Sequence, residues 1–340
     1  MDVLKLVSKK DLLDFSQNLS VTRNYMGDRL FPDIKTPSLE AEFYRLSDPR
    51  QIPKMAKVHA FDTEAAIGTR PTFEKVTMEK MLIKEKINQT ERVKQLAKNV
   101  EQQNLLNYIF DDMARLAESV KTRTEVAKME LIQSGKIKVK ENDLDFTVDY
   151  GVPAGNKKAY DWKLDTHDIL ADIQAMVDIA KDAGYTPTKV VTSTAILNLL
   201  RKNKGIQTAI YGTNGVGTFL ATPQIDALMM AMFGFNIEVN DERYSYETAA
   251  GAITPKRFID DNKFVMLSTL ANGTLGSGLW GVTPEEEAEG PWTAKSSSQY
   301  ITLTMWSTPD PVATWTKASG VFIPAMPNAK GIVIGTITMA

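Results

Sequence analysis

The chain has 340 residues, 43% of them hydrophobic, which is enough for a core and for one large domain or two ordinary ones. Its net charge of −2 provides no overall positive field for nucleic acid or anionic lipid, and the absence of cysteine excludes disulfides, thiolate zinc sites and cysteine nucleophiles. The first thirty residues do not fit a secretory signal and no apolar stretch reaches the ~20 residues of a membrane span, so we expect a cytoplasmic protein without a membrane partner.

The first 87 residues predict two segments with little core of their own. Residues 1–37 combine loosely helical spacing with Gly27, Pro32 and Pro37, which indicates an extended arm containing a short helix. Residues 38–87 contain the charged strand-like stretches EAEFYRL, PKMAKVHAF and, from 72 to 86, TFEKVTMEKMLIKEK. The turn-rich DTEAAIGTRP lies between the last two, which predicts an extended β-hairpin loop. An arm needs docking to become ordered and an isolated hairpin is marginal in water, so we expect both to lie on another surface; an ordinary mobile surface hairpin is the alternative.

A very long helix is predicted over 91–134, because apolar residues recur every three or four positions and Gly135 provides a left-handed stop. A break near Gln102 and Gln103 is an alternative. Unbroken, the helix would exceed the width of a compact domain at ~1.5 Å per residue, so we expect it to act as a spine. Its apolar positions keep no strict heptad, which disfavours a coiled coil. We expect a sheet built from late strands, QYITLTMWST and KGIVIGTITM, to cover its apolar stripe. The opposite face is charged, and there Glu125 and Lys128 can pair loosely.

Residues from about 160 to 270 alternate helices with short buried strands and predict a compact α/β subdomain. The strands are KVVTS, FNIEV and KFVMLST. We expect Thr166, Ser193 and Thr222 to cap the helices, and Gly184 and Gly234 to end two of them.

No constellation of residues indicates an enzyme. The chain has two histidines, His59 and His167, too few for a multi-histidine metal site, and exposed or capping roles are favoured for both. YGTNGVGT at 211–218 has the wrong glycine order for a dinucleotide fingerprint, and no P-loop Lys-Ser/Thr follows it. Asp111 and Asp112 point about a hundred degrees apart on a helix, and the glutamates at 285–287 suit a solvated loop. We expect no catalytic residue, no cofactor and no metal.

Several motifs, in this order, resemble the lambda-type capsid protein E family, which belongs to the tailed-phage major capsid proteins with the Hong Kong 97-type fold. They span nearly the whole chain: NYMGDRLFP (24–32), VHAFDTEAAIGTRP (58–71), AKMELIQSGKI (127–137), VDYGVP (148–153), GVTPEEE (281–287) and TKASGVFIPAMPNAKGIVIG (316–335). The order arm, charged loop, spine helix, α/β subdomain and return strands matches the plan of that fold.

The resemblance implies an α+β shell protein, found in the virion capsid and assembled in the host cytoplasm. Its implied partners are copies of itself in hexamers and pentamers, a portal, double-stranded DNA bound without sequence specificity, and a separate scaffold protein, since no fused scaffolding segment precedes the arm. The implied segments are an arm (1–37), an extended loop (38–87), a peripheral subdomain with the spine (88–160), an axial α/β subdomain (161–285) and return strands of the peripheral subdomain (286–340).

The arm and the loop are the expected contacts with neighbouring subunits, because they lack a self-contained core. The candidate contact residues are Phe31, Lys54, Lys57, Phe61, Asp62, Glu64, Arg70 and Glu74. Two other interpretations stay open. One is a cellular nanocompartment shell of the same fold, which should lack the long arm and enclose an enzyme. The other is a nucleotide-using enzyme centred on GTNGVG.

Overall fold

The computed structural model describes residues 23–46, 55–59, 61, 64–65, 73–89, 102–248, 251–287, 294–298, 300–310 and 312–339. The chain divides into two compact units that each combine distant segments. Unit 1 comprises residues 1–41, 77–128 and 277–325, and unit 2 comprises residues 42–76, 129–276 and 326–340.

The core of unit 1 is a six-stranded sheet organised around one long strand, β16 (Val312–Ala325). β16 pairs antiparallel with β15 (Ile301–Pro309), with β4 (Met81–Gln89) and, at its C-terminal end, with β13 (Ser277–Trp280). The sheet is completed by β14 (Ala294–Ser298) beside β15 and by β1 (Asp33–Lys35), which runs parallel to β13.

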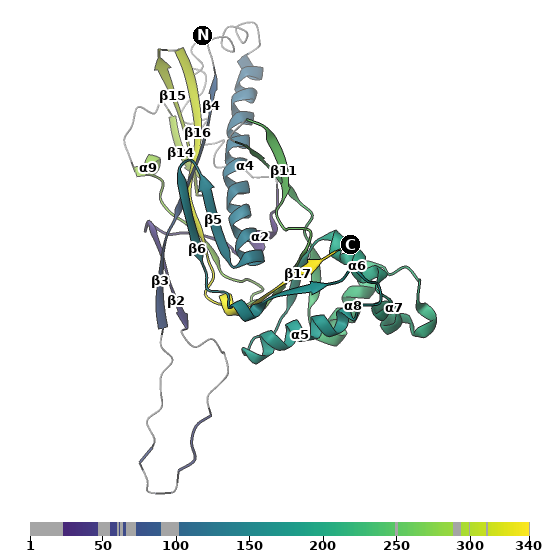
Figure 1. Cartoon of the computed structure of the whole chain (residues 1–340). Helices are drawn as coiled ribbons and strands as arrows, with labels where there is room; N and C mark the ends of the chain where they lie inside the picture. The colour runs from purple at the N-terminus through teal and green to yellow at the C-terminus, as the bar shows by residue number, and fades with distance from the viewer. Residues whose placement is uncertain are drawn as a thin grey trace. The chain divides into compact units, whose positions relative to one another are not determined.

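Helix α4 (Gln102–Ser134) lies beside this sheet (Figure 1). Within unit 1 its apolar stripe is fully buried at Met113, Leu116, Ala117 and Val120. Gly320 of β16 permits a close approach, because a Cβ there would lie 3.0 Å from Val120 Cγ1. A strand from far along the chain therefore covers the spine, but it is β16, which was not one of the two strands expected to do so. The expected QYITLTMWST forms β15 of the same sheet, paired with β16. The predicted part of the helix before Gln102 lies outside the described residues.

Unit 2 contains a five-stranded sheet in the order β7-β17-β12-β8-β9. The strands are β7 (Lys157–Asp161), β8 (Lys189–Thr192), β9 (Asn236–Val239), β12 (Lys263–Leu267) and β17 (Ile332–Thr338). β12 is antiparallel to both of its neighbours, whereas β8 and β9 are parallel. The three strands predicted between 160 and 270 are therefore present, as β8, β9 and β12.

Four helices pack with this sheet into one hydrophobic core: α5 (Ile169–Asp182), α6 (Thr194–Lys202), α7 (Lys204–Tyr211) and α8 (Thr222–Phe233). Ser193 caps α6 as predicted, since its hydroxyl accepts from the Ile196 amide, and Gly234 ends α8 in the left-handed conformation. The other two predicted caps were wrong. α5 is capped by Asp168 rather than Thr166, and α8 starts at Thr222 with Ala221 in the cap position.

Three two-stranded hairpins complete the described chain: β2 (Glu40–Leu46) with β3 (Phe73–Glu79), β5 (Lys136–Glu141) with β6 (Leu144–Asp149), and β10 (Arg243–Glu247) with β11 (Ile253–Arg257). Short helices occur at α2 (Met26–Leu30) and α9 (Pro284–Glu287), with 3₁₀ turns at Ala154–Asn156, Thr213–Gly215 and Ala329–Gly331.

Two predicted assignments are corrected by strand pairing. The continuous strand expected from 72 to 86 is interrupted at Lys80: β3 pairs with β2, whereas β4 joins the sheet around β16. The last strand, β17, was expected in the sheet that covers the spine, but it pairs with β12 and β7 in unit 2. A strand-like pattern predicts an extended segment but does not determine its partner, because pairing depends on distant residues.

Candidate functional site

The described part of the arm is docked on its own chain. The Tyr25 hydroxyl lies 2.8 Å from Thr122 Oγ1 of α4, and Tyr25 is 1% exposed. Leu30 and Phe31 are also buried in unit 1. Burying an apolar side chain of this size contributes about 1.5–3 kcal/mol. This segment is therefore ordered by contacts within one chain, which corrects the expectation that the whole arm depends on another subunit.

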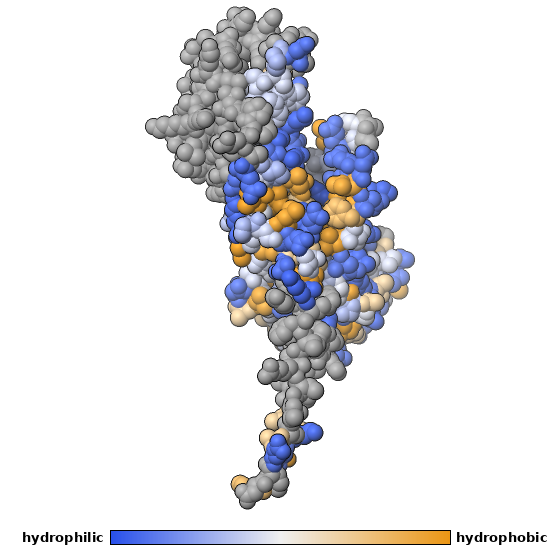
Figure 2. Space-filling model, turned by 90° about the vertical axis from the view of Figure 1, so that its left-hand side faces the viewer, coloured by the Kyte–Doolittle hydropathy of each residue, from blue (hydrophilic) through white to orange (hydrophobic). Residues whose placement is uncertain are grey.

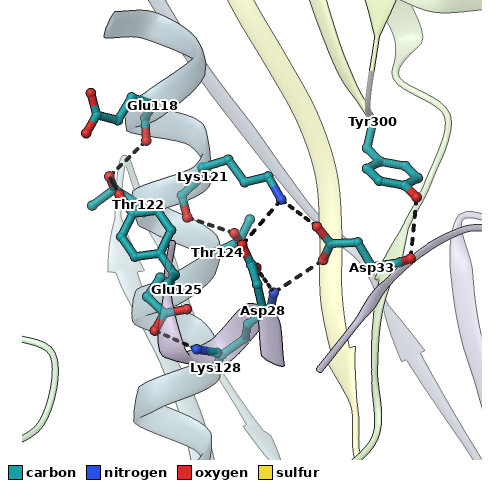
Figure 3. Close-up of polar contacts among 11 residues, drawn as sticks. Asp28, Asp33, Glu118, Lys121, Thr122, Thr124, Glu125, Lys128 and Tyr300 are labelled. Carbon is teal, nitrogen blue, oxygen red and sulfur yellow. Dashed lines mark hydrogen bonds and ion pairs between the residues drawn. The ribbon is translucent and has the colours of Figure 1, made fainter. Parts of the chain in front are cut away.

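Buried charges fix where the arm sits on the helix (Figure 3). Lys128 of α4 is 0% exposed, and its ammonium lies 2.6 Å from Asp28 Oδ1 and 3.2 Å from Asp33 Oδ1. Lys121 lies two helical turns before Lys128 on the same stripe, and its ammonium is 2.5 Å from Asp33 Oδ2 and 3.8 Å from Asp28 Oδ2. Two lysines of α4 thus converge on two aspartates of the arm.

Glu125, one helical turn from Lys121 and from Lys128, adds a third contact to the arm. Its Oε1 accepts a hydrogen bond of 2.9 Å from the Gly27 amide, and that glycine belongs to α2. A Cβ at Gly27 would lie 2.2 Å from Glu125 Oε2 and 2.8 Å from Lys128 Cδ. Only glycine lets the backbone approach the helix this closely.

We define Asp28, Asp33, Lys121, Glu125 and Lys128 as the arm-docking cluster. Burial alone would raise the pKa of the Asp33 carboxyl, but the positive charges of Lys128 and Lys121 outweigh it and hold the pKa below its ordinary value. The net worth of a buried ion pair is modest, whereas removing one partner costs several kcal/mol because an uncompensated charge remains. The main effect of the cluster is therefore to determine the position of the arm along α4. Its contribution to the total free energy of unfolding is smaller.

A second charged contact anchors α9 to the sheet of unit 1. Glu285 is 4% exposed, and its Oε1 lies 2.8 Å from the Lys317 ammonium of β16 and 2.9 Å from that of Lys84 in β4. Burial would raise the pKa of Glu285, but hydrogen bonds from Lys317 and Lys84 lower it to about 2. Lys35 of β1 pairs with the neighbouring Glu286 at 2.5 Å. The predicted solvated glutamate loop is thus, at 285–286, a set of paired carboxylates.

The described loop residues between β2 and β3 are exposed, including large apolar side chains. Met55 is 90%, Val58 99% and Phe61 101% exposed. Lys57 and Glu64, two of the candidate contact residues, are exposed as well. On the face of the molecule shown in Figure 2, hydrophobic and hydrophilic residues are interspersed over the coloured surface.

The remaining candidate contact residues have different outcomes. Phe31 is wrong as a contact with a neighbour, because its side chain is 0% exposed within its own chain. Glu74 lies in β3. Lys54, Asp62 and Arg70 lie outside the described residues. For all candidates except Phe31, contact with a neighbouring subunit stays a prediction.

The residues considered as catalytic or phosphate-binding groups make hydrogen bonds to other side chains of the chain. His167 Nε2 lies 2.7 Å from Asp172 Oδ2, which also accepts from the Trp162 indole at 2.7 Å. In the glycine loop, the Gly217 amide donates to Gln207 Oε1 at 2.8 Å, so a side chain occupies a donor that a phosphate would need. Among the described residues, no group of three His, Asp or Glu could hold a metal, and no helix there is long and apolar enough to cross a membrane.

Sequence reasoning missed the arm-docking cluster. Glu125 and Lys128 were expected to pair with each other on a solvated face, yet they are 1% and 0% exposed. A signal was present: Lys121, Glu125 and Lys128 are spaced i, i+4, i+7 and form one stripe of the helix. Their partners Asp28 and Asp33 are about a hundred positions earlier, which no local pattern reveals.

The fold occurs in several solved structures. A protein described as a capsid protein of an Escherichia coli CFT073 prophage matches with a TM-score of 0.63 at 14% identity, over 98% of this chain and 99% of that one. A phage-related protein of Bordetella bronchiseptica RB50 matches with a TM-score of 0.54 at 12% identity, over 95% of both chains. The mature capsid of bacteriophage PhiM1 matches with a TM-score of 0.50 at 10% identity, over 93% of this chain and 88% of that one.

These likenesses identify the α+β fold as the Hong Kong 97-type fold of phage capsid proteins. No curated protein matches the chain in sequence. The family model described as phage major capsid protein E matches residues 8–337, which is nearly the whole chain. The chain therefore belongs to the phage major capsid protein E family.

Proposed function

We propose that this capsid protein assembles, as hexamers and pentamers of itself, into the closed icosahedral head shell of a tailed phage. The shell would enclose double-stranded DNA and form in the host cytoplasm with a separate scaffold protein and a portal. The role is structural. DNA would be contained without sequence recognition, which is consistent with a net charge of −2, because a shell with a strong positive field would hold the genome tightly.

The exposed side chains among the described residues between β2 and β3 carry this proposal. Met55, Val58 and Phe61 each expose 90% or more of their surface. Each such side chain gains about 1.5–3 kcal/mol when it is buried, so the loop has a driving force for docking on another surface. In a self-assembling protein that surface is a second copy, and many modest contacts of this kind allow a shell to close.

The segments proposed from the sequence suit these roles. Within those segments, the loop (38–87 without β4) would lie over a neighbouring subunit and the α/β segment (161–285 without β13 and α9) would surround the capsomer axis. The spine with the return strands (88–160 and 286–340 without β17) would form the periphery. The arm (1–37) would then have two parts with different functions. Its second half is anchored within the chain by the arm-docking cluster, and the contact with a neighbour is proposed for residues 1–22.

The test is particle formation by the full chain expressed with its scaffold. The double variant Val58→Ser, Phe61→Ser should yield several-fold fewer closed particles in electron micrographs and gradient sedimentation than the wild type. Phe61→Met keeps an apolar side chain and serves as the matched control, with near wild-type yield. Both side chains are exposed, so circular dichroism of the unassembled variants should be unchanged. Wild-type particle yield from the double serine variant would contradict the role of the loop.

A further inference from the structure

Lys80 is the one residue between β3, the second strand of the loop hairpin, and β4 of the sheet. Its amide donates to the Leu39 carbonyl at 3.2 Å, directly before β2 begins at Glu40. The residue where β2 begins and the residue where β3 ends therefore lie side by side at the base of the hairpin. We define the hairpin root as residues 36–41 and 77–80.

The Lys80 side chain crosses this root and holds both sides of it. It is 3% exposed, and its ammonium donates to Thr36 Oγ1 at 2.5 Å, to the Thr36 carbonyl at 3.4 Å and to the Ser38 carbonyl. Its methylene stem passes over Gly281, where a Cβ would lie 3.2 Å from Lys80 Cδ. The amine is thus surrounded by three oxygens of the segment that enters the hairpin.

The partners of Lys80 are unusual for a buried lysine. Buried lysines are normally paired with a carboxylate. Among the described residues, no carboxylate forms an ion pair with the Lys80 ammonium within 4.0 Å. Burial lowers the pKa of the amine, so placing a charge here is unfavourable by itself. A buried ammonium bound to backbone carbonyls ties chain segments together, and this position would otherwise favour an apolar residue.

We propose that Lys80 is the positioning residue of the hairpin root, and that it holds residues 36–39 against the start of β4 so that the loop is presented to a neighbouring copy with little freedom at its base. This inference rests on the proposed function. A loop whose base is already ordered loses less conformational entropy when it docks, so it binds more strongly through the same contacts.

The first experiment follows backbone amide exchange of the unassembled full-length chain, kept dilute, by mass spectrometry. Lys80→Met keeps most of the stem and removes the amine. Peptides covering 36–41 and 77–82 should exchange about tenfold faster or more in this variant, because hydrogen bonds from a charged donor are stronger than those from a neutral one. Peptides from β12 and β17 should be unchanged. Wild-type exchange at the root would overturn the proposal.

Lys75→Met is the matched control, because it removes a lysine of the same hairpin that is 48% exposed and pairs with Glu42 at 2.6 Å. It should leave exchange at the root unchanged; faster exchange there would show that any lost charge has this effect, and would overturn the proposal. If Lys80→Met does not fold, Thr36→Val decides, because it removes only the Oγ1 acceptor. Faster exchange at the root in that variant supports the proposal, and wild-type exchange overturns it.

Particle yield then connects the root to assembly. Lys80→Met should give several-fold fewer particles than Lys75→Met, although the exposed loop side chains are untouched. A loosened root with undiminished particle yield would overturn the link to docking. If the wild-type chain itself forms no particles, the proposed function fails while the exchange result still stands, so the two failures are distinguishable.

Discussion

Replacing Lys128 with methionine should release the arm while leaving the rest of unit 1 folded. Removing one partner of a buried ion pair typically costs about 3–5 kcal/mol, because the other charge is left without compensation. Here Lys121 remains 2.5 Å from Asp33, and the Asp28 side chain is 35% exposed, so both carboxylates keep some compensation. We therefore expect a loss of free energy of unfolding below that range, about 2–3 kcal/mol.

That loss should concentrate in the arm, because the cluster joins residues 25–35 to α4. The appropriate assay is amide exchange at Phe31, whose amide donates to the Gly27 carbonyl at 2.8 Å and is protected while α2 is docked. A loss of about 2–3 kcal/mol corresponds to roughly 30- to 150-fold faster exchange at about 1.4 kcal/mol per factor of ten. Lys158→Met, which removes an exposed lysine of β7, is the control and should leave the arm unchanged.

A double-variant cycle separates the charge from the packing of the stem. Asp33→Asn removes one of the carboxylates that Lys128 compensates, so Lys128→Met combined with Asp33→Asn should lose less than the sum of the single variants. Strictly additive losses would show that the two residues are not coupled. Unchanged arm exchange in Lys128→Met alone would refute the view that buried charge fixes the register.

Three further outcomes follow from the contacts described above. Gly27→Ala should destabilise the docked arm by about 1–3 kcal/mol, because its Cβ would lie 2.2 Å from Glu125 Oε2, and chemical denaturation measures this; wild-type stability would show that Glu125 moves away freely. Because the folded pKa of Glu285 is about 2, below its ordinary 4.5, the stability it contributes is present above pH 4.5 and is lost as the pH falls towards 2. Glu285→Gln should therefore be less stable than the wild type at pH 6 and should lose less stability on acidification, and parallel pH profiles would contradict this. Asn156→Ala should cost about 1–3 kcal/mol in thermal unfolding, since the buried amide donates to the Lys330 and Ile332 carbonyls at 2.9 Å each; a neutral change would mean that water replaces both bonds.

Local periodicity predicted the elements well where one face is uniformly apolar. The stripe of α4 from Met113 to Val120 is buried as its spacing indicates, and Gly135 ends the helix at a φ of +74°. Ser193 caps its helix because a hydroxyl there satisfies an amide that has no partner within the helix. Each of these features depends on residues only a few positions apart, which a single sequence displays directly.

The candidate site could not be predicted in the same way. Lys128 and Glu125 carry charges, and charged residues are almost never fully buried unless they are paired. Their partners lie in the arm, and the sequence offers no local reason to connect the two segments. The interruption at Lys80 was missed for a similar reason, since the residues around it are strand-like throughout and only the pairing of β4 with β16 reveals the break.

The position of β16 near the end of the chain has a consequence for synthesis on the ribosome. Helix α4 is complete at Ser134, but the strand that covers its apolar stripe ends at Ala325. At roughly 5–20 residues per second, translation of the intervening segment takes about 10–40 seconds. During that time β16 does not yet cover the apolar stripe of the nascent helix, and Lys121 and Lys128 do not yet face the sheet. Chaperone binding during translation should therefore be concentrated on this helix.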